Sequence, residues 1–143
     1  MIELLVVLAI AGIAALLALI SWHGFQLRAD RAQTRAVIRQ AFNRAATEAA
    51  ARSLPHRLVY DADGPAFVVQ RKDGSRYLEV VRLDLPSGAS TDLADGDYAT
   101  FTPPGRIEYD GGIETSFTLR YPGGGSATVS ISLVGDVKVV DAP

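Results

Sequence analysis

The chain has 143 residues, a formal net charge of −2 and no cysteine. This length provides for one modest hydrophobic core but not for two. The lack of cysteine excludes disulfides, thiolate catalysis and zinc–thiolate sites. By count from the sequence, the charge is about +3 over residues 1–52 and about −5 over the remainder, so we expect a basic segment followed by an acidic domain.

The N-terminal residues form an apolar run from Leu4 to Ile20, which one carboxylate, Glu3, precedes. A helix of this length is about 25 Å long, enough to cross most of a bilayer core. A carboxylate at the end of a membrane helix is costly, so Glu3 is a candidate functional residue. A secretory signal peptide would need a basic residue before the run and a small-residue cleavage site after it, and the sequence has neither.

The segment Ile2-Glu3-Leu4-Leu5-Val6-Val7, followed by Ala9-Ile10-Ala11-Gly12-Ile13, resembles the N-terminus of type IV pilins and type II secretion pseudopilins. The resemblance implies that Glu3 acts in assembly by pairing with the N-terminal amine of a neighbouring subunit. A carboxylate in a low-dielectric environment needs such a cation or must be neutralised. The resemblance also implies a membrane helix that includes Leu4, Leu5, Val6, Val7, Gly12, Ile13, Leu16 and Ile20.

In these families a basic leader ending in glycine precedes a mature chain that begins Phe-Thr-Leu-Ile-Glu, and a prepilin peptidase cuts after the glycine. Met1 stands where the family has the third mature residue. We therefore expect the native chain to extend upstream of Met1 and to be a substrate of this peptidase. An ordinary single-span anchor would also fit the hydropathy, but it would leave Glu3 without a role.

The helical pattern continues beyond the apolar run, because residues 22–52 contain no proline and only one glycine. Trp22 follows the run, in the headgroup layer or within a stack of subunits, and Pro55 ends the helix. One apolar side of this segment comprises Phe25, Ile38, Phe42, Ala45 and Ala49. A second stripe, which we expect to face anionic lipid or acidic patches on neighbouring subunits, comprises Arg28, Arg31, Arg35 and Arg39.

Short β-like runs separated by glycine-containing turns follow Pro55. We expect strands at residues 58–60, 66–70, 77–85, 107–109, 117–121, 128–133 and 137–140, and a loop over Pro86–Pro104. The C-terminal half resembles the GspH/FimT family of minor pseudopilins, which implies a β-sandwich head set against the helix. This resemblance rests on Phe101-Thr102-Pro103-Pro104-Gly105, Ser116-Phe117-Thr118-Leu119, residues 127–133 and Gly135-Asp136-Val137-Lys138-Val139.

These patterns predict an α+β fold in which a long N-terminal helix packs on an antiparallel β-sandwich head. We expect residues 1–21 to be the transmembrane part of the helix, residues 22–54 its extracytoplasmic part, and residues 55–143 the head. The resemblance implies a minor pseudopilin of the type II secretion system, in the bacterial inner membrane with its head in the periplasm. Its partners would be other minor and major pseudopilins and inner-membrane lipid.

Two alternatives remain open at the level of sequence. The first is a minor type IV pilin that serves pilus assembly, adhesion or DNA uptake. The second is a single-span membrane protein with an unrelated ligand-binding β-domain. DNA-binding relatives carry Gly-Arg-x-Arg in the last hairpin, where this chain has Gly135-Asp136-Val137-Lys138. Because a carboxylate repels phosphate, Asp136 disfavours DNA as a partner.

No combination of residues in the sequence indicates an enzyme or a cofactor. His23 and His56 lie in unrelated contexts, and single histidines of this kind are usually structural or solvated. Asp92, Asp95 and Asp97 form a weak candidate for calcium, but their spacing matches no known calcium loop. A solvated acidic loop is the favoured interpretation, and we expect an assembly subunit with no catalytic residues, resident metal or cofactor.

Overall fold

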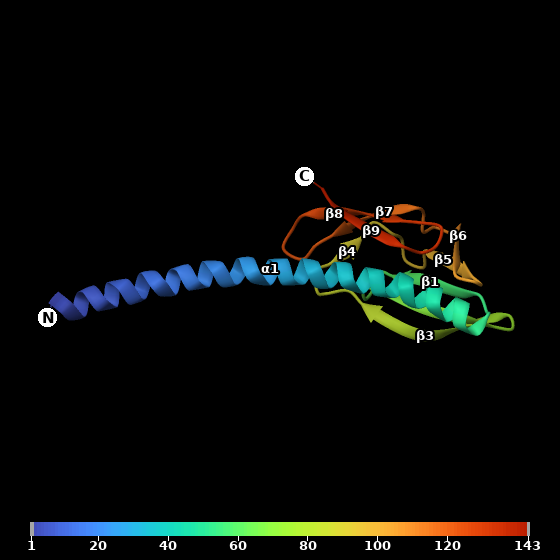
Figure 1. Cartoon of the computed structure of the whole chain (residues 1–143), viewed down its shortest axis with the longest axis horizontal. Helices are drawn as coiled ribbons and strands as arrows, with labels where there is room; N and C mark the ends of the chain where they lie inside the picture. Colours follow the sequence, from blue (N-terminus) through green and yellow to red (C-terminus); the bar gives the residue numbers. More distant parts are fainter. Residues whose placement is uncertain (1, 143) are drawn as a thin grey trace.

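The structure, a computed structural model, describes residues 2–142 except for the side chains of Ile20, Ser21 and His23. Over this range a single helix, α1 (Ile2–Arg52), precedes nine strands. Figure 1 shows α1 extending well beyond the head, with the strands gathered around its C-terminal half. The strands are β1 (His56–Asp61), β2 (Ala66–Asp73), β3 (Arg76–Asp84), β4 (Ser90–Thr91), β5 (Tyr98–Thr102), β6 (Arg106–Gly111), β7 (Ser116–Arg120), β8 (Ser126–Ile131) and β9 (Val137–Asp141).

The strands form two antiparallel sheets. The first has five strands in the order β3-β2-β1-β5-β6, and the second has four in the order β4-β7-β8-β9. The inner face of each sheet carries apolar side chains; in β8, for example, Ala127, Val129 and Ile131 are buried while Thr128 and Ser130 are exposed. This alternation is expected of a strand with one buried face. The predicted α+β fold with a long N-terminal helix is confirmed.

Helix α1 runs without interruption from Ile2 to Arg52. Alanine, leucine and arginine, which favour helix, dominate this segment. Ser53 then adopts the left-handed conformation with a φ of 51°, as residues just after a helix often do. Pro55, which disfavours helical geometry in the residue before it, follows two positions later. These features end the helix at the place that the sequence predicts.

Only the C-terminal half of α1 packs against the head. Its buried positions recur at helical spacing and are Thr34, Ile38, Ala41, Phe42, Ala45, Glu48 and Ala49. Phe42 lies at the centre, with ring centroids 6.0 Å from Phe67, 6.2 Å from Phe101 and 6.4 Å from Phe117. These rings come from α1 and from both sheets, so Phe42 joins all three layers in one core. Of the five residues on the predicted apolar side, Ile38, Phe42, Ala45 and Ala49 are buried. The side chain of Phe25 is 68% exposed, because it precedes the part of α1 that the strands cover.

The expected loop over Pro86–Pro104 is also corrected. It contains β4 and β5, and β5 lies between β1 and β6 in the five-stranded sheet. The usual alternation of a strand is absent there because Ala99, Thr100 and Phe101 are all buried. Thr100 faces away from the core, but its hydroxyl donates to Asp110 at 2.9 Å. A short strand with small residues and no polar–apolar alternation gives a weak sequence signal.

We expect Phe42→Ala to destabilise the head by about 3–5 kcal/mol, because it removes a fully buried ring and leaves a cavity among three others. The thermal midpoint of the full chain in detergent, followed by circular dichroism, measures this effect. Leu78→Ala is the matched control, since Leu78 is 44% exposed on β3 and its loss should cost less than about 1 kcal/mol. Equal effects of the two substitutions would contradict the central position of Phe42.

Candidate functional site: the exposed helix and its attachment to the head

The N-terminal half of α1 has no partner within the described fold. Helix α1 is long and apolar enough to cross a membrane, and none of its most apolar 18-residue window is buried in the structure. Most residues of the expected membrane helix are exposed: Leu4, Leu5, Val6, Val7, Ile13 and Leu16 are each at least 51% exposed. Gly12 has open space around it. The side chain of Ile20 lies outside the described residues. A continuous apolar surface of this size marks a site of contact with lipid or protein.

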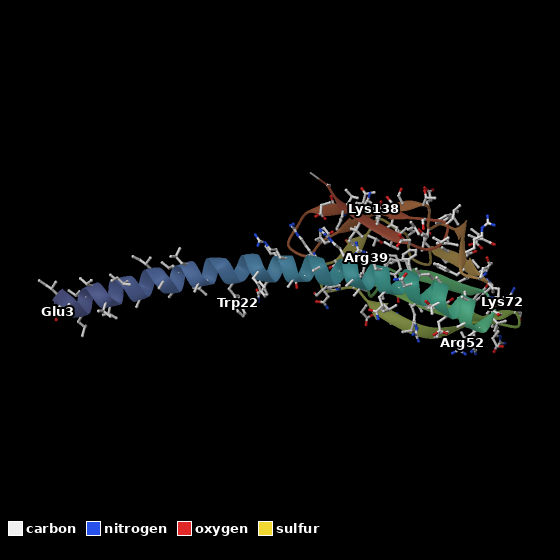
Figure 2. All side chains as sticks on the ribbon, in the orientation of Figure 1. Glu3, Trp22, Arg39, Arg52, Lys72 and Lys138 are labelled. Carbon is white, nitrogen blue, oxygen red and sulfur yellow. The ribbon has the colours of Figure 1, made fainter. Side chains whose placement is uncertain are left out.

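Glu3 lies in the first turn of α1 with its side chain exposed (Figure 2). A carboxylate there interacts favourably with the partial positive charge of the helix N-terminus. The carboxylate is therefore accessible to a cation from another molecule, at the end of the apolar surface farthest from the head.

The four arginines of the predicted stripe divide into two pairs. Arg31 and Arg35 turn toward the head of their own chain: Arg31 Nη2 donates to the carbonyl of Gly124 at 3.2 Å, and Arg35 binds Tyr121 and Asp141. Arg28 and Arg39 are exposed, and Arg39 is labelled in Figure 2. The stripe is therefore not one uniform surface: Arg31 and Arg35 are partly covered and bound by the head, whereas Arg28 and Arg39 are exposed.

Arg35, Tyr121 and Asp141 form a cluster, here called the attachment cluster, that joins α1 to the four-stranded sheet. Arg35 Nε donates to the Tyr121 hydroxyl at 2.8 Å, that hydroxyl donates to Asp141 Oδ1 at 2.9 Å, and Arg35 Nη2 donates to the same oxygen at 2.6 Å. The guanidinium carbons of Arg31 and Arg35 also lie 5.5 Å from the centroid of the Tyr121 ring. Each of the three side chains is thus hydrogen-bonded to the other two.

The attachment cluster shifts the pKa values of its members. The pKa of Asp141 is lowered from its ordinary value of 3.8, mainly by the hydrogen bond from Tyr121 and further by Arg35. The pKa of Tyr121 is raised, chiefly because burial disfavours the phenolate. The pKa of Arg35 is raised by its hydrogen bond with Tyr121. At neutral pH the cluster therefore comprises a carboxylate, a neutral phenol and a guanidinium.

A turn of three glycines fixes the same part of α1 to the head. Gly123, Gly124 and Gly125 lie in the hairpin turn that connects β7 to β8, and all three have positive φ. A Cβ atom on Gly123 would collide with the side chain of Leu27. Glycine is therefore favoured at this position by its backbone conformation, while a larger residue would also require the Leu27 side chain to move.

The acidic residues Asp92, Asp95 and Asp97 serve the loops around them. Asp92 Oδ1 accepts from the Thr118 amide at 2.8 Å, Asp95 Oδ1 from the Ala62 amide at 3.0 Å and Asp97 Oδ2 from the Ala94 amide at 2.8 Å. Within residues 2–142, no group of three or more acidic, histidine or cysteine side chains is arranged to hold a metal ion.

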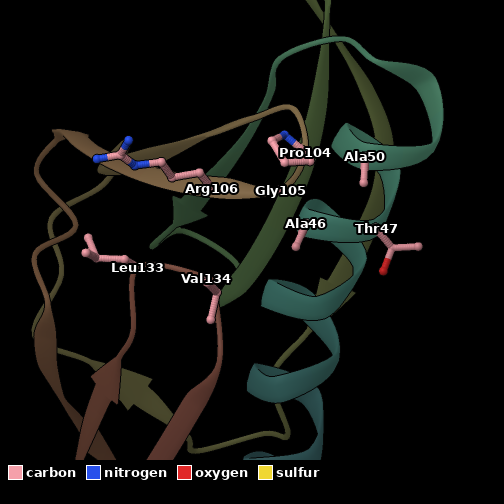
Figure 3. Close-up of a pocket in the computed structure, with 8 residues that line it drawn as sticks. All are labelled: Ala46, Thr47, Ala50, Pro104, Gly105, Arg106, Leu133 and Val134. Atoms are coloured by element: carbon pink, nitrogen blue, oxygen red, sulfur yellow. The ribbon is translucent and has the colours of Figure 1, made fainter.

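An open apolar groove lies between the C-terminal part of α1 and the head (Figure 3). It has a volume of about 560 Å³ and is lined mainly by Ala46, Ala50, Pro104, Leu133 and Val134. The predicted strand at 128–133 placed Leu133 on a buried face, which was wrong: β8 ends at Ile131, and Leu133 is 59% exposed. Neither the groove nor the attachment cluster could be found from sequence, because each joins residues separated by more than 50 positions.

No protein family model, no curated protein and no solved structure matches this chain. What is established is therefore the architecture: a long N-terminal helix, with an apolar half able to span a membrane, packed on antiparallel sheets. This architecture is compatible with a pilin-like fold. The attachment cluster and the three-glycine turn hold the helix and the head in one fixed relation.

We expect Asp141→Asn to lower the thermal midpoint of the head at neutral pH. A carboxyl whose pKa is lowered by folding contributes stability above its ordinary pKa, and this stability is lost as the pH falls through the lowered value. The difference between wild type and variant in the thermal midpoint should thus be constant above about pH 5 and should shrink as the pH falls below the ordinary carboxyl pKa of 3.8.

The measurement is the midpoint of both proteins in detergent across this pH range. Tyr121→Phe is the companion variant, because it keeps the ring beneath Arg31 and Arg35 but removes the hydroxyl that binds Asp141. A difference between wild type and Asp141→Asn that does not change with pH would contradict the role of the ionised carboxylate.

Proposed function

We propose that this chain is a minor pseudopilin of the GspH/FimT type, a structural subunit of the type II secretion pseudopilus. The observation that carries the proposal is the division of α1: one continuous helix whose apolar first half is unpartnered and whose second half is built into the head. The N-terminal sequence around Glu3 and the Phe101-to-Val139 motifs support the same family. Filament assembly gives a function to both halves of the helix.

The apolar half of α1 has two environments in this proposal. Before assembly it lies in inner-membrane lipid, and afterwards it packs among the helices of other minor and major subunits. Both environments are apolar, so moving between them has a small cost compared with exposing the same surface to water. The transfer therefore replaces contacts with lipid by contacts with other helices and does not expose the apolar surface to water.

Glu3 supplies the specificity that apolar packing lacks. In a low-dielectric filament core its carboxylate must pair with a cation, and the N-terminal amine of a neighbouring subunit, exposed by prepilin peptidase, is the proposed partner. Arg28 and Arg39, which are exposed, would contact lipid phosphates or acidic patches on neighbouring subunits. The rigid attachment of α1 lets the head follow the helix as the filament moves in the periplasm.

A minor type IV pilin would use the same helix, carboxylate and head. The type II secretion system and the type IV pilus are therefore distinguished by the cellular process that each supports. The hairpin that binds DNA in some relatives carries Asp136 here, exposed in the turn before β9. This carboxylate favours secretion over DNA uptake.

We expect Glu3→Ala to remain in the membrane but to be lost from filaments, because the apolar run is intact while the carboxylate is missing. The amount of the chain in sheared filaments relative to membranes measures this, and a fall of about tenfold or more corresponds to loss of one ion pair in low dielectric. Leu5→Ala, at a neighbouring position that is also exposed, is the control. Normal incorporation of the Glu3→Ala variant into filaments would contradict the proposed assembly role of Glu3 and would favour an ordinary membrane anchor.

Deletion of the gene in its source organism distinguishes a subunit of the type II secretion system from a subunit of a type IV pilus. We expect secreted enzymes to accumulate in the periplasm while twitching motility and natural transformation stay normal. Loss of twitching or transformation with normal secretion would assign the chain to a type IV pilus instead.

A further inference from the structure

On the outer face of the five-stranded sheet, an arginine is flanked by two tyrosine rings. Arg57 alternates along β1 with the buried His56 and Leu58, so its side chain points away from α1. Its guanidinium carbon lies 4.0 Å from the ring centroid of Tyr77 and 4.1 Å from that of Tyr98. Because Tyr77 belongs to β3 and Tyr98 to β5, the rings approach from the two sides of β1. They cover the faces of the guanidinium, and its N–H groups lie in the plane between them.

The Tyr98 ring is fixed from its other side by the backbone of β6. A Cβ atom on Gly111 would lie 2.4 Å from three atoms of this ring, and a glycine within a strand commonly marks such a close approach. The backbone of Gly111 does not adopt a positive φ, so it is the ring that excludes a side chain there. Tyr98 is thus held between Gly111 and Arg57, and the position of the guanidinium is set before any ligand binds.

Arg57 has no acceptor for its N–H groups within residues 2–142. Its Nε is buried without a hydrogen-bond partner, and its guanidinium forms no ion pair with a carboxylate in this range. The arginines that do pair with carboxylates are Arg35, Arg44, Arg52 and Arg82. A buried donor without an acceptor is costly, and a bound oxyanion would supply the acceptor.

The nearest acidic residues of the same sheet are separated from Arg57 by a strand. In the pairing register, Gln70 stands between Arg57 and Glu79, and Thr100 stands between Arg57 and Glu108. Two strand spacings are about 9–10 Å. Glu79 and Glu108 are exposed, so salt screens their charges over such a distance. Neither residue neutralises the guanidinium.

We infer that Arg57, Tyr77 and Tyr98 form a binding site for a carboxylate group. A carboxylate is planar and accepts two parallel hydrogen bonds from a guanidinium, so it can lie in the plane between the two rings. A phosphate is tetrahedral, and two of its oxygens would stand out of this plane, against the negative faces of the rings. The geometry therefore selects a carboxylate over a phosphate. The inference goes beyond the proposed function, and neither depends on the other.

The carboxylate has two sources, a small organic acid or an acidic side chain or C-terminus of a polypeptide. Beside the site lies a hollow of about 330 Å³, to which Gln70, the cross-strand neighbour of Arg57, contributes. Its other lining residues include Val59 and Val68 and charged side chains of both signs, Asp61, Glu79, Arg82 and Asp95. A polypeptide would place further atoms in this hollow, whereas a small acid would occupy only the space between the rings.

A titration of the full chain in detergent micelles tests this inference, with the Nε–H signal of Arg57 in proton–nitrogen correlation spectra as the readout. We expect sodium acetate to shift this signal saturably, with an affinity about tenfold or more above that at Arg120. Arg120 is the internal control, because it is exposed and forms no ion pair within the described residues. Sodium phosphate at the same ionic strength should shift neither signal saturably. Equal responses to acetate and phosphate, or equal responses at the two arginines, would overturn the inference.

A capped tripeptide with one glutamate distinguishes the two sources. An affinity for this peptide about tenfold or more above that for acetate would assign the ligand to a polypeptide. Equal affinities would assign it to a small carboxylic acid. Both results support a carboxylate site, whereas binding of neither probe at Arg57 would overturn it.

Two variants test the arrangement around Arg57. Gly111→Ala should weaken acetate binding about two- to fivefold, because the added methyl group displaces the Tyr98 ring and removes one cation–π contact. Gly24→Ala is the matched control, since that position has open space around it. An unchanged affinity in Gly111→Ala would overturn the role of Tyr98. Glu79→Gln should leave the Arg57 signal of the ligand-free protein in place; a shift as large as that caused by acetate would show that Glu79 is already the acceptor and would overturn the site.

Discussion

The apolar half of α1 is the constraint on which the rest of the molecule depends. Its leucine, isoleucine and valine side chains are exposed along the helix, and the fold provides nothing to cover them. Burying such a surface is worth about 25 cal/mol for each Å² removed from water. Summed over the whole apolar half of α1, this free energy far exceeds that of any surface ion pair in the head. In the proposed function lipid or other helices surround it, and the head is attached to the helix in a way that leaves it uncovered.

The attachment works at two levels. Phe42 and its ring partners from both sheets supply a non-directional apolar core. Nearer the apolar half of α1, Arg35 with Tyr121 and Asp141, and the glycine turn against Leu27, set the direction in which the helix leaves the head. The proposed filament subunit would need both, because a head that rotated freely on its helix could not transmit a defined displacement.

The sequence predicts what depends on local pattern. Continuous helix formers, a terminating proline and the alternation of Val129 and Ile131 give the helix, its end and the class of the head. The sequence does not predict what depends on distant residues meeting: β5 has small buried residues without alternation, Arg31 and Arg35 find partners about 90–106 positions away, and the groove combines α1 with two turns. The exposure of Leu133 follows from β8 ending at Ile131, a boundary that sequence patterns define poorly.

The most direct measurement is the N-terminus of the native chain, determined by mass spectrometry on protein from membranes of its source organism. If α1 is a pilin-type assembly helix, the mature chain begins two residues upstream of Met1, with an N-methylated phenylalanine whose amine is available to Glu3 of a neighbour. A native chain that begins at Met1 itself, or after cleavage beyond Ile20, would contradict this, since no processed amine would then lie beside the carboxylate.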